Sequence, residues 1–379
     1  MINGQLPSSI RHLKNLEELY PYGCNFSSSI TRSLTNLTRL TLLDLSQSNF
    51  QGSIPLGSNS INGSIPSSFF HLVNLTYLDL SSNNLSGTVE LDTFAKLEYL
   101  GYVDLSNNSL SLTTTNSTHS SFRNIRTLRL LSCNISKFLE FLKTRKELLE
   151  MLDLSNSHLN EELNPLCNLH SLAYLDLSNN QFGRLIPTCL ENLELDISHD
   201  GLQGVLPKSL ANRTTLEVLN VGHNLIINTF PFWLENLPQL KVIALRDNKF
   251  HGPIGQPGKR LAFTNLNIID VSHNNFIGYE MEYVKILTMF KAADFSHNKF
   301  HGKILTSIGR LKALHVLNFL RNGFTGRISL SLVNLTKLES LGLSQNKLSG
   351  EISQQLTSLA FLEVFDVSQN NLIGIIPQG

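Results

Sequence analysis

Histidine side chains are the residues of this 379-residue chain whose type and spacing most directly suggest chemistry. His199 and His223 stand 24 residues apart, and so do His273 and His297. Imidazoles brought side by side could respond to a mildly acidic pH, because the unperturbed pKa of histidine is about 6.5. A metal site is disfavoured because no third type of ligand joins either pair. The alternative is that all four are solvated turn residues.

Catalytic motifs are absent from the sequence. There is no G-x-S-x-G, no H-E-x-x-H and no protein-kinase signature. Gly258 and Lys259 look like part of a phosphate-binding loop, but the glycine spacing is wrong and Arg260 replaces the required serine or threonine. We therefore predict a protein that is not an enzyme, with no catalytic residue, no metal and no cofactor.

The charge balance excludes one class of partner. Lys plus Arg and Asp plus Glu both number 30, and charged residues make up 16% of the chain. Without a basic excess, nucleic-acid binding through phosphate contacts is not predicted. No run approaches the roughly 18 apolar residues that span a bilayer. The first 20 residues also lack the apolar stretch of a secretory signal.

A repeat sets the spacing of these residues. Residues 75–87 (LTYLDLSSNNLSG) and 335–350 (LTKLESLGLSQNKLSG) share the pattern LxxLxxLxLxxNxLxGxIP. Its asparagine position, called the mark below, recurs along almost the whole chain. The marks are Cys24, Ser48, Asn59, Asn83, Asn108, Cys133, Ser157, Asn180, Asp200, Asn224, Asn248, Asn274, Asn298, Asn322, Asn346 and Asn370. Such a period predicts one leucine-rich repeat solenoid over 1–379, with about 15 or 16 coils.

Each position of the repeat has a physical reason. In LxL two apolar side chains point inward from a short strand, and the residue between them faces out. The predicted fold class is an α/β solenoid, a horseshoe or superhelix with a parallel concave β-sheet and with short strands, turns and 3-10 helices on the convex side. The mark turns inward and bonds backbone groups of its own and the neighbouring coil. We expect this structural ladder at Cys24, Asn83, Asn108, Cys133, Asn180, Asn224, Asn248, Asn274, Asn298, Asn322, Asn346 and Asn370.

The LxGxIP tail resembles the plant-type extracellular repeat of receptor-like kinases, receptor-like proteins and polygalacturonase-inhibiting proteins. Residues 280–294 (EMEYVKILTMFKAAD) and 370–379 (NNLIGIIPQG) are similar to receptor-like proteins in particular. The resemblance implies a receptor module on the extracellular side of the plasma membrane, commonly in pathogen defence. It implies a peptide, carbohydrate or microbial protein as ligand and a co-receptor kinase on residues 287–379. Membrane attachment would come only through a segment absent from this chain.

The chain departs from that family pattern in several places. Coils at 49–59 and 181–200 are irregular, and the island insertion expected between Gly278 and Lys285 is missing. Both caps are missing as well, so we expect a solenoid truncated at both ends. Two other interpretations stay open: a soluble inhibitor resembling polygalacturonase-inhibiting proteins, and a non-functional truncated receptor relic.

The concave face is the predicted ligand site. Most strands read LDLS, and their aspartates form a regular background row. Positions that break this rule are the ligand-face candidates, with neutral drift as the alternative. They are Arg129, Leu131, Asn220, His223, Arg246, Asp247, Asn318 and Arg321.

Cysteines and glycosylation sequons complete the candidates. Cys24 and Cys133 are expected as buried ladder residues, too far apart to pair. Cys167 and Cys189 lie on neighbouring coils, where a disulfide is one option and two free thiols are the other. Candidate N-glycosylation sites are Asn25, Asn36, Asn62, Asn74, Asn84, Asn107, Asn116, Asn134, Asn212 and Asn334.

Overall fold

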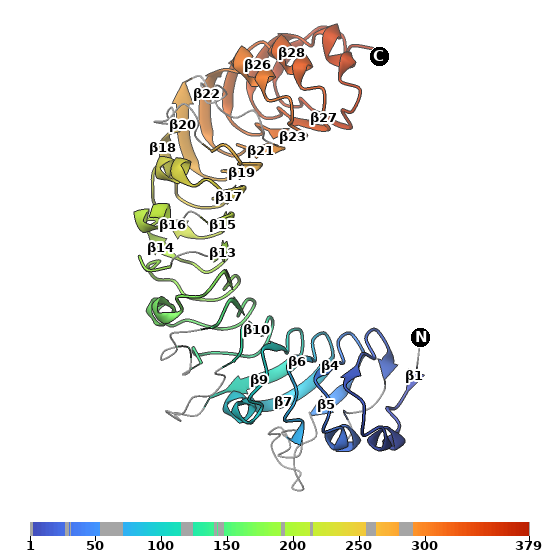
Figure 1. Cartoon of the computed structure of the whole chain (residues 1–379). Coiled ribbons are helices and arrows are strands. Elements are labelled where there is room, and N and C mark those ends of the chain that lie inside the picture. Colours follow the sequence, from blue (N-terminus) through green and yellow to red (C-terminus); the bar gives the residue numbers. More distant parts are fainter. Residues whose placement is uncertain are drawn as a thin grey trace. The chain divides into compact units, whose positions relative to one another are not determined.

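The computed structural model describes residues 3–26, 30, 32–53, 71–114, 124–139, 142, 148–190, 194–212, 215–254, 263–279 and 291–378. They fall into two compact units, Met1–Phe182 and Gly183–Gly379. Both are built from the same coil, in which one short strand joins a parallel sheet and the chain returns through turns and 3-10 helices (Figure 1).

One strand of each coil joins what we call the main sheet of its unit. In the first unit the order is β2 (Glu18–Leu19), β4 (Leu42–Asp44), β6 (Tyr77–Asp79), β8 (Tyr102–Asp104), β10 (Thr127–Arg129), β11 (Met151–Asp153) and β12 (Tyr174–Asp176). In the second unit it is β13 (Glu194–Asp196), β15 (Val218–Asn220), β17 (Val242–Ala244), β19 (Ile268–Asp270), β21 (Ala292–Asp294), β23 (Val316–Asn318), β25 (Ser340–Gly342) and β27 (Val364–Asp366). Described neighbours within each unit pair in parallel, so equivalent positions of the repeat lie side by side.

The strand register explains the leucine pattern. In β15 the middle residue, Leu219, is fully buried, while Val218 and Asn220 on either side of it are half-buried. Leu219 lies opposite Ile243, which lies opposite Ile269, so the inward residues stack from coil to coil. The inward side chains form the core between the main sheet and the rest of the coil.

A second set of strands follows the marks. In the first unit β1 (Asn3–Gly4) pairs with β3 (Asn25–Phe26), and β7 (Asn84–Glu90) lies between β5 (Gln51–Ser53) and β9 (Ser109–Thr113). In the second unit β14 (Gln203–Gly204) pairs with β16 (Leu225–Ile226). A further sheet there has the order β18 (His251–Pro253), β20 (Asn275–Tyr279), β22 (Lys299–Lys303), β24 (Gly323–Gly326), β26 (Lys347–Glu351) and β28 (Asn371–Ile373).

Short 3-10 helices close many of the coils. They are η1 (Ser8–His12), η2 (Arg32–Asn36), η4 (Leu91–Lys96), η5 (Asn164–Asn168), η6 (Lys208–Asn212), η7 (Phe232–Asn236), η9 (Thr306–Arg310), η10 (Leu330–Asn334) and η11 (Gln354–Ser358). Most end in a bond from the following N–H back to a carbonyl three residues earlier, as at Leu234 and Leu237.

Asparagines at the marks join each coil to the one before it. The Asn248 Nδ2 donates to the carbonyls of Leu245 and Arg246 in its own coil, at 3.1 and 3.0 Å. It also donates to Val221 O at 2.8 Å, and its Oδ1 accepts from Ile226 N at 3.0 Å, both in the preceding coil. Bonds of this kind recur at Asn83, Asn108, Asn180, Asn224, Asn274, Asn298, Asn322, Asn346 and Asn370.

The cysteines differ in state. Cys133 is 2% exposed, and its Sγ lies 3.5 Å from Leu105 O, whereas Cys24 is only half-buried. Cys24 and Cys133 are free thiols. Cys167 and Cys189 are disulfide-bonded.

Some sequence predictions lie outside the described residues. These are the mark Asn59 in the irregular 49–59 coil and the sequons Asn62 and Asn116. The same holds for most of the position expected for the island, between Gly278 and Lys285.

Candidate ligand-binding face

The solvent side of the second unit's main sheet carries an apolar row. Its members are the first residues of successive strands, and the strand register places each beside the next. Ile268 is 40% exposed and Val316 is 37% exposed. The other members, Val218, Val242 and Ala292, are half-buried. A row of at least partly exposed apolar side chains on a rigid sheet is typical of interaction sites. We call this the apolar row: Val218, Val242, Ile268, Ala292 and Val316.

Sequence reasoning missed the apolar row. It singled out positions that break the LDLS pattern, which are seven polar residues and Leu131, and not the first residue of each strand. The signal was available in the residue that precedes the two inward-facing apolar residues of each strand, which is β-branched at Val218, Val242, Ile268 and Val316. Period-two alternation puts that position on the outer face of the sheet.

Beside the apolar row runs a column of aspartates and asparagines. The Asp270 Oδ1 accepts from Ser272 N at 3.0 Å, so the aspartate fixes the turn after its strand. The Asn220 Nδ2 donates to Asp196 Oδ2 at 2.7 Å, and the Asn318 Nδ2 donates to Asp294 Oδ2 at 3.0 Å. The candidates Asn220 and Asn318 are therefore bound to the preceding coil's aspartate, which leaves them less free to meet a ligand.

The residue directly before each mark adopts the same left-handed turn conformation along the second unit, and we call the first six of these residues the rim column. They are His199, His223, Asp247, His273, His297 and Arg321, all with φ between 48° and 61°, and Gln345 and Gln369 continue the series. Side-chain-bearing residues rarely adopt this left-handed conformation, and here it recurs because every coil makes the same tight turn. The turn thus places six side chains at equivalent positions along one edge of the sheet.

The structure brings three of the sequence candidates together in the rim. His223 Nδ1 lies 3.1 Å from Asp247 Oδ2. Arg246 Nε lies 3.5 Å from the same oxygen and 4.0 Å from Asp270 Oδ2. This cluster balances its own charges, and its ion pairs stay partly exposed to solvent.

The four histidines of the rim form two stacked pairs. Ring centroids of His199 and His223 lie 3.8 Å apart, and those of His273 and His297 also lie 3.8 Å apart. Burial, together with the neighbouring His199, lowers the pKa of His223 below its ordinary value of 6.5. Burial and then His273 do the same to the pKa of His297.

Arg321 is the candidate with the most accessible charge. Its side chain is exposed, and it forms no ion pair with any residue in the described ranges. It follows the half-buried Leu320 on the turn after β23, the strand that ends in Asn318. Asn318 and Arg321 therefore belong to one coil, although only Arg321 is available to a ligand.

The other two candidates lie in the first unit. Arg129 reaches Asp104 Oδ2 with Nη1 at 3.5 Å and Asp153 Oδ2 with Nε at 3.9 Å. Leu131 is half-buried, and its N–H donates to Ser106 Oγ at 3.1 Å. The arginine thus neutralises two nearly buried carboxylates, and both residues have a local structural role.

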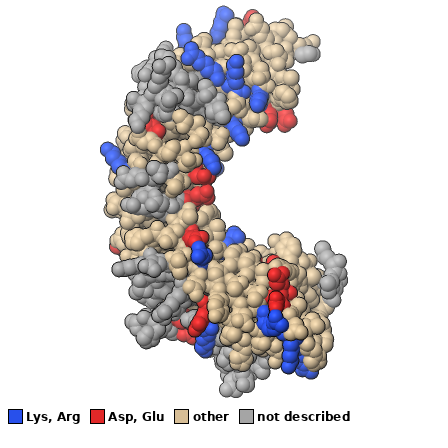
Figure 2. All heavy atoms as spheres, in the orientation of Figure 1, with Lys and Arg blue, Asp and Glu red and all other residues tan. Residues whose placement is uncertain are grey.

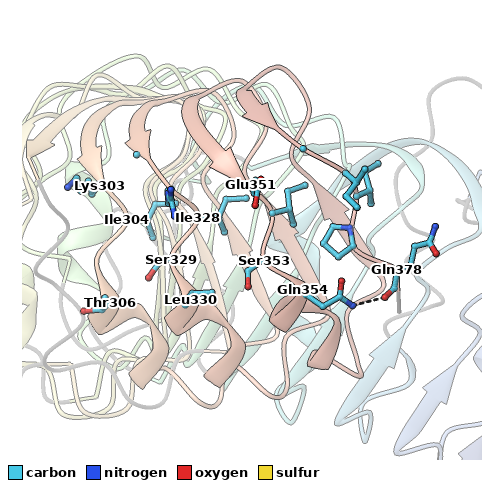
Figure 3. Close-up of a pocket in the computed structure, with 17 residues that line it drawn as sticks. Lys303, Ile304, Thr306, Ile328, Ser329, Leu330, Glu351, Ser353, Gln354 and Gln378 are labelled. Carbon is cyan, nitrogen blue, oxygen red and sulfur yellow. Dashed lines mark hydrogen bonds between the residues drawn. The ribbon is translucent and has the colours of Figure 1, made fainter.

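A second surface lies on the last coils, away from the main-sheet strands. A groove of about 1630 Å³ runs between β22, β24, β26 and β28 on one side and η9, η10 and η11 on the other (Figure 3). Ile304 and Ile328 are buried at its floor, and Lys303, Arg327 and Glu351 are exposed at its border. The Gln354 Nε2 donates to Gln378 O at 2.7 Å across one end.

Charged side chains are sparse on the visible face of the described residues (Figure 2). Figure 2 shows Lys, Arg, Asp and Glu side chains scattered among wide uncharged areas, as expected at 16% charged residues. Within the described ranges, no three histidine, cysteine or acidic side chains are grouped as a metal site would require. No helix of the described residues has the length and apolar character needed to cross a membrane.

Comparison with known proteins agrees with this architecture. A family model described as Leucine Rich Repeat matches residues 74–97, 171–193 and 337–359. Receptor-like protein 18 of Arabidopsis thaliana is 34% identical over 322 residues, which cover 70% of this chain and 38% of that protein. Receptor-like protein 43 of the same plant is 47% identical over 119 residues, or 30% of this chain and 16% of that protein. The chain is a homologue of the plant leucine-rich repeat receptor-like proteins.

Solved structures confirm the predicted fold. The ectodomain of the Arabidopsis thaliana membrane receptor kinase GASSHO1/SCHENGEN3, in complex with CASPARIAN STRIP INTEGRITY FACTOR 2, matches with a TM-score of 0.78 and 27% identity. That match covers 99% of this chain and 47% of the ectodomain chain. The Arabidopsis receptor kinase HAESA, in complex with the peptide hormone IDA and the co-receptor SERK1, matches with a TM-score of 0.74 and 28% identity over 99% of this chain and 65% of that one. This receptor-like protein homologue therefore shares the leucine-rich repeat fold of plant receptor ectodomains.

Proposed function

We propose that this receptor-like protein homologue is the ligand-recognition part of a plant cell-surface receptor, and that it binds a peptide across the second unit's main sheet. The apolar row is the observation that carries the proposal. At about 4.8 Å between strands, a row from β15 to β23 extends roughly 19 Å, which matches about six residues of extended peptide. HAESA, a structural relative, is described with a bound peptide hormone.

A matched pair of substitutions tests this proposal. Ile268 and Ile277 belong to the second unit and are 40% and 42% exposed, but only Ile268 lies in the apolar row. Peptides are selected from a displayed random library on the secreted chain, and their affinities are measured by calorimetry. Ile268→Asp should weaken the selected peptides by about tenfold or more, because apolar burial is lost and a charge is desolvated. Ile277→Asp should leave affinity within about twofold, and equal losses in the two variants would reject the proposed face.

The extracellular setting rests on two features of the chain. The sequon asparagines whose side chains are described are all exposed: Asn25, Asn36, Asn74, Asn84, Asn107, Asn134 and Asn334. Cys167 and Cys189 are disulfide-bonded, which fits an oxidising compartment. Secretion from plant cells followed by endoglycosidase treatment and mass spectrometry would test this, since an unmodified chain would argue against an extracellular site.

Signalling, in this proposal, passes through a partner kinase that contacts residues 287–379. The groove beside β24 and β26 offers an apolar floor bordered by Lys303, Arg327 and Glu351, and HAESA is described with a co-receptor. Arg327→Glu should weaken capture of a co-receptor kinase ectodomain in a pull-down. Lys249→Glu, an exposed charge reversal in the same unit, should not weaken it. Pathogen defence is the role we propose, and plants lacking the gene should lose a response to a microbial extract.

A further inference from the structure

The rim column has more capacity for positive charge than the described carboxylates around it can neutralise. Resting on the proposed function, we propose that the rim column of the second unit binds a carboxylate-bearing segment of the peptide ligand, and that acidification strengthens this binding. The ligand class is then an acidic peptide, with its apolar side chains on the apolar row and its carboxylates at the rim.

The first line of argument is the geometry of the His273–His297 pair. The two rings are nearly parallel, with an interplanar angle of 13°. The His297 Nδ1 is buried and has no hydrogen-bond partner among the described residues. Stacked imidazole rings do not hydrogen-bond to each other through their ring nitrogens. A ring that takes up a proton here therefore needs a hydrogen-bond acceptor from another group.

The charged groups that face His297 do not supply that acceptor. They are His273, Arg321, Asp294 and Asp247. The Asp294 Oδ1 accepts from Ser296 N at 2.8 Å, and its Oδ2 accepts from the Asn318 side chain. Asp247 already has His223 and Arg246 within ion-pair distance. Both carboxylates are therefore engaged, and Arg321 adds a positive charge.

The His199–His223 pair repeats the arrangement at the other end of the column. The charged groups that face His223 are His199, Asp247, Arg246 and Asp270. The Asp270 Oδ1 accepts from both the backbone N and the Oγ of Ser272, at 3.0 and 2.6 Å, and Arg246 approaches its Oδ2. Asp247 is thus the sole carboxylate within the rim column, flanked by one histidine pair on each side.

Proton linkage gives the direction of the pH effect. Burial and a stacked imidazole lower the pKa of His223 and of His297, so these two rings are neutral near neutral pH, and Arg321 is the charge in the column that attracts an anion. At mildly acidic pH a proton taken up by a histidine pair is repelled by the positive charges beside it. A ligand carboxylate bound at the rim offsets that repulsion. Ligand binding then raises proton affinity, so by reciprocity lower pH raises ligand affinity.

The experiment uses the full chain and a rhodamine-labelled short polyglutamate peptide, followed by fluorescence anisotropy at about pH 5.5 and about pH 7.5 and constant ionic strength. We expect binding about tenfold tighter at the lower pH, the change produced when binding takes up an average of about half a proton over these two pH units. The double variant His273→Phe with His297→Phe keeps two stacked rings without titration and should reduce the ratio to about threefold or less. Arg321→Gln should weaken binding at both pH values.

A matched control distinguishes protonation of the rim-column histidines from protonation of a histidine elsewhere in the unit. His315 lies in the same unit, on the turn before β23, with its Nδ1 2.7 Å from Glu339 Oε1. His315→Gln should leave the affinity ratio unchanged. Equal affinity at the two pH values would overturn the proposal, and so would a His315→Gln effect on the affinity ratio as large as that of the double histidine variant. Binding of oligogalacturonate but not of polyglutamate would also overturn it. The library peptides and Ile268→Asp test the peptide face independently, so failure of one proposal is distinguishable from failure of the other.

Discussion

Removing one ladder asparagine should cost a large part of the second unit's stability. Asn248 is 8% exposed, and its side chain bonds three carbonyls and one N–H in two coils. Asn248→Ala removes these bonds and leaves Ile226 N unsatisfied inside the protein, whereas Val221 O still accepts from the Asn224 side chain. At about 1 kcal/mol per net hydrogen bond, and about 1–3 kcal/mol for an orphaned buried group, the loss is about 3 to 5 kcal/mol. A domain's total stability is about 5 to 15 kcal/mol.

Serine at the same mark should be less harmful. Ser157 occupies a natural mark, and its Oγ lies 2.9 Å from Cys133 O and 3.5 Å from Ser155 O. A hydroxyl thus retains part of the ladder, and Asn248→Ser should cost about 1 to 2 kcal/mol less than the alanine variant. Asn236→Ala is the control, because Asn236 is exposed and bonds only within its own 3-10 helix, so it should cost about 0.5 kcal/mol or less.

Urea unfolding followed by tryptophan fluorescence measures these differences. Trp233 is the single tryptophan and lies in η7 of the same unit. A loss below about 1 kcal/mol for Asn248→Ala would refute the hydrogen-bond account, as would equal losses for alanine and serine.

Three further predictions concern titration, thiol reactivity and close packing. The folded-state pKa values of His223 and His297 lie below the unfolded value, so the unfolded chain binds more protons, and stability should fall as pH drops below about 6.5. Thermal unfolding between about pH 7.5 and 5 should show a declining Tm, less so in His297→Phe, and a flat profile would contradict the lowered pKa values. Iodoacetamide under native, non-reducing conditions should label Cys24 but not Cys133, because burial raises the pKa of Cys133 to about 12; mass spectrometry that finds Cys133 labelled first would reverse this expectation. Gly309→Ala should destabilise the chain by about 1–3 kcal/mol in the urea assay, because an added Cβ would lie 2.3 Å from the backbone oxygen of Ser331; an unchanged midpoint would show that η9 and η10 can move apart.

The coil could be predicted from sequence because its rules are local. Leu219 and Val221 must point inward once the strand alternates, and Asn224 must turn in once the strand ends. The mark asparagines, the parallel main sheets and the 3-10 turns follow from one 24-residue pattern. The irregular coil at 49–59 breaks that pattern, and its residues 54–59 lie outside the described part of the chain.

The candidate face was harder to predict because it depends on contacts between coils. Asn220 departs from the LDLS pattern in sequence, but its amide is bonded to Asp196 of the preceding coil. Arg129 likewise departs from the pattern because it neutralises Asp104 and Asp153 on the strands beside it. A single repeat gives no sign of such pairing. Ile268 was not among the sequence candidates, and its exposure on the outer side of β19 follows from the strand register.

The ladder also has a direction, and this matters for how the protein is made. Asn274 completes the turn after Asn248 by accepting from Phe250 N, and Asn298 does the same for Phe276 N one coil later. A coil is thus closed by a side chain that the ribosome adds about one repeat after the coil itself. During synthesis the newest coil always waits for the next, so the nascent chain carries one unfinished turn that moves forward with translation. A coil that has left the ribosome therefore keeps this turn exposed until the next mark has also emerged.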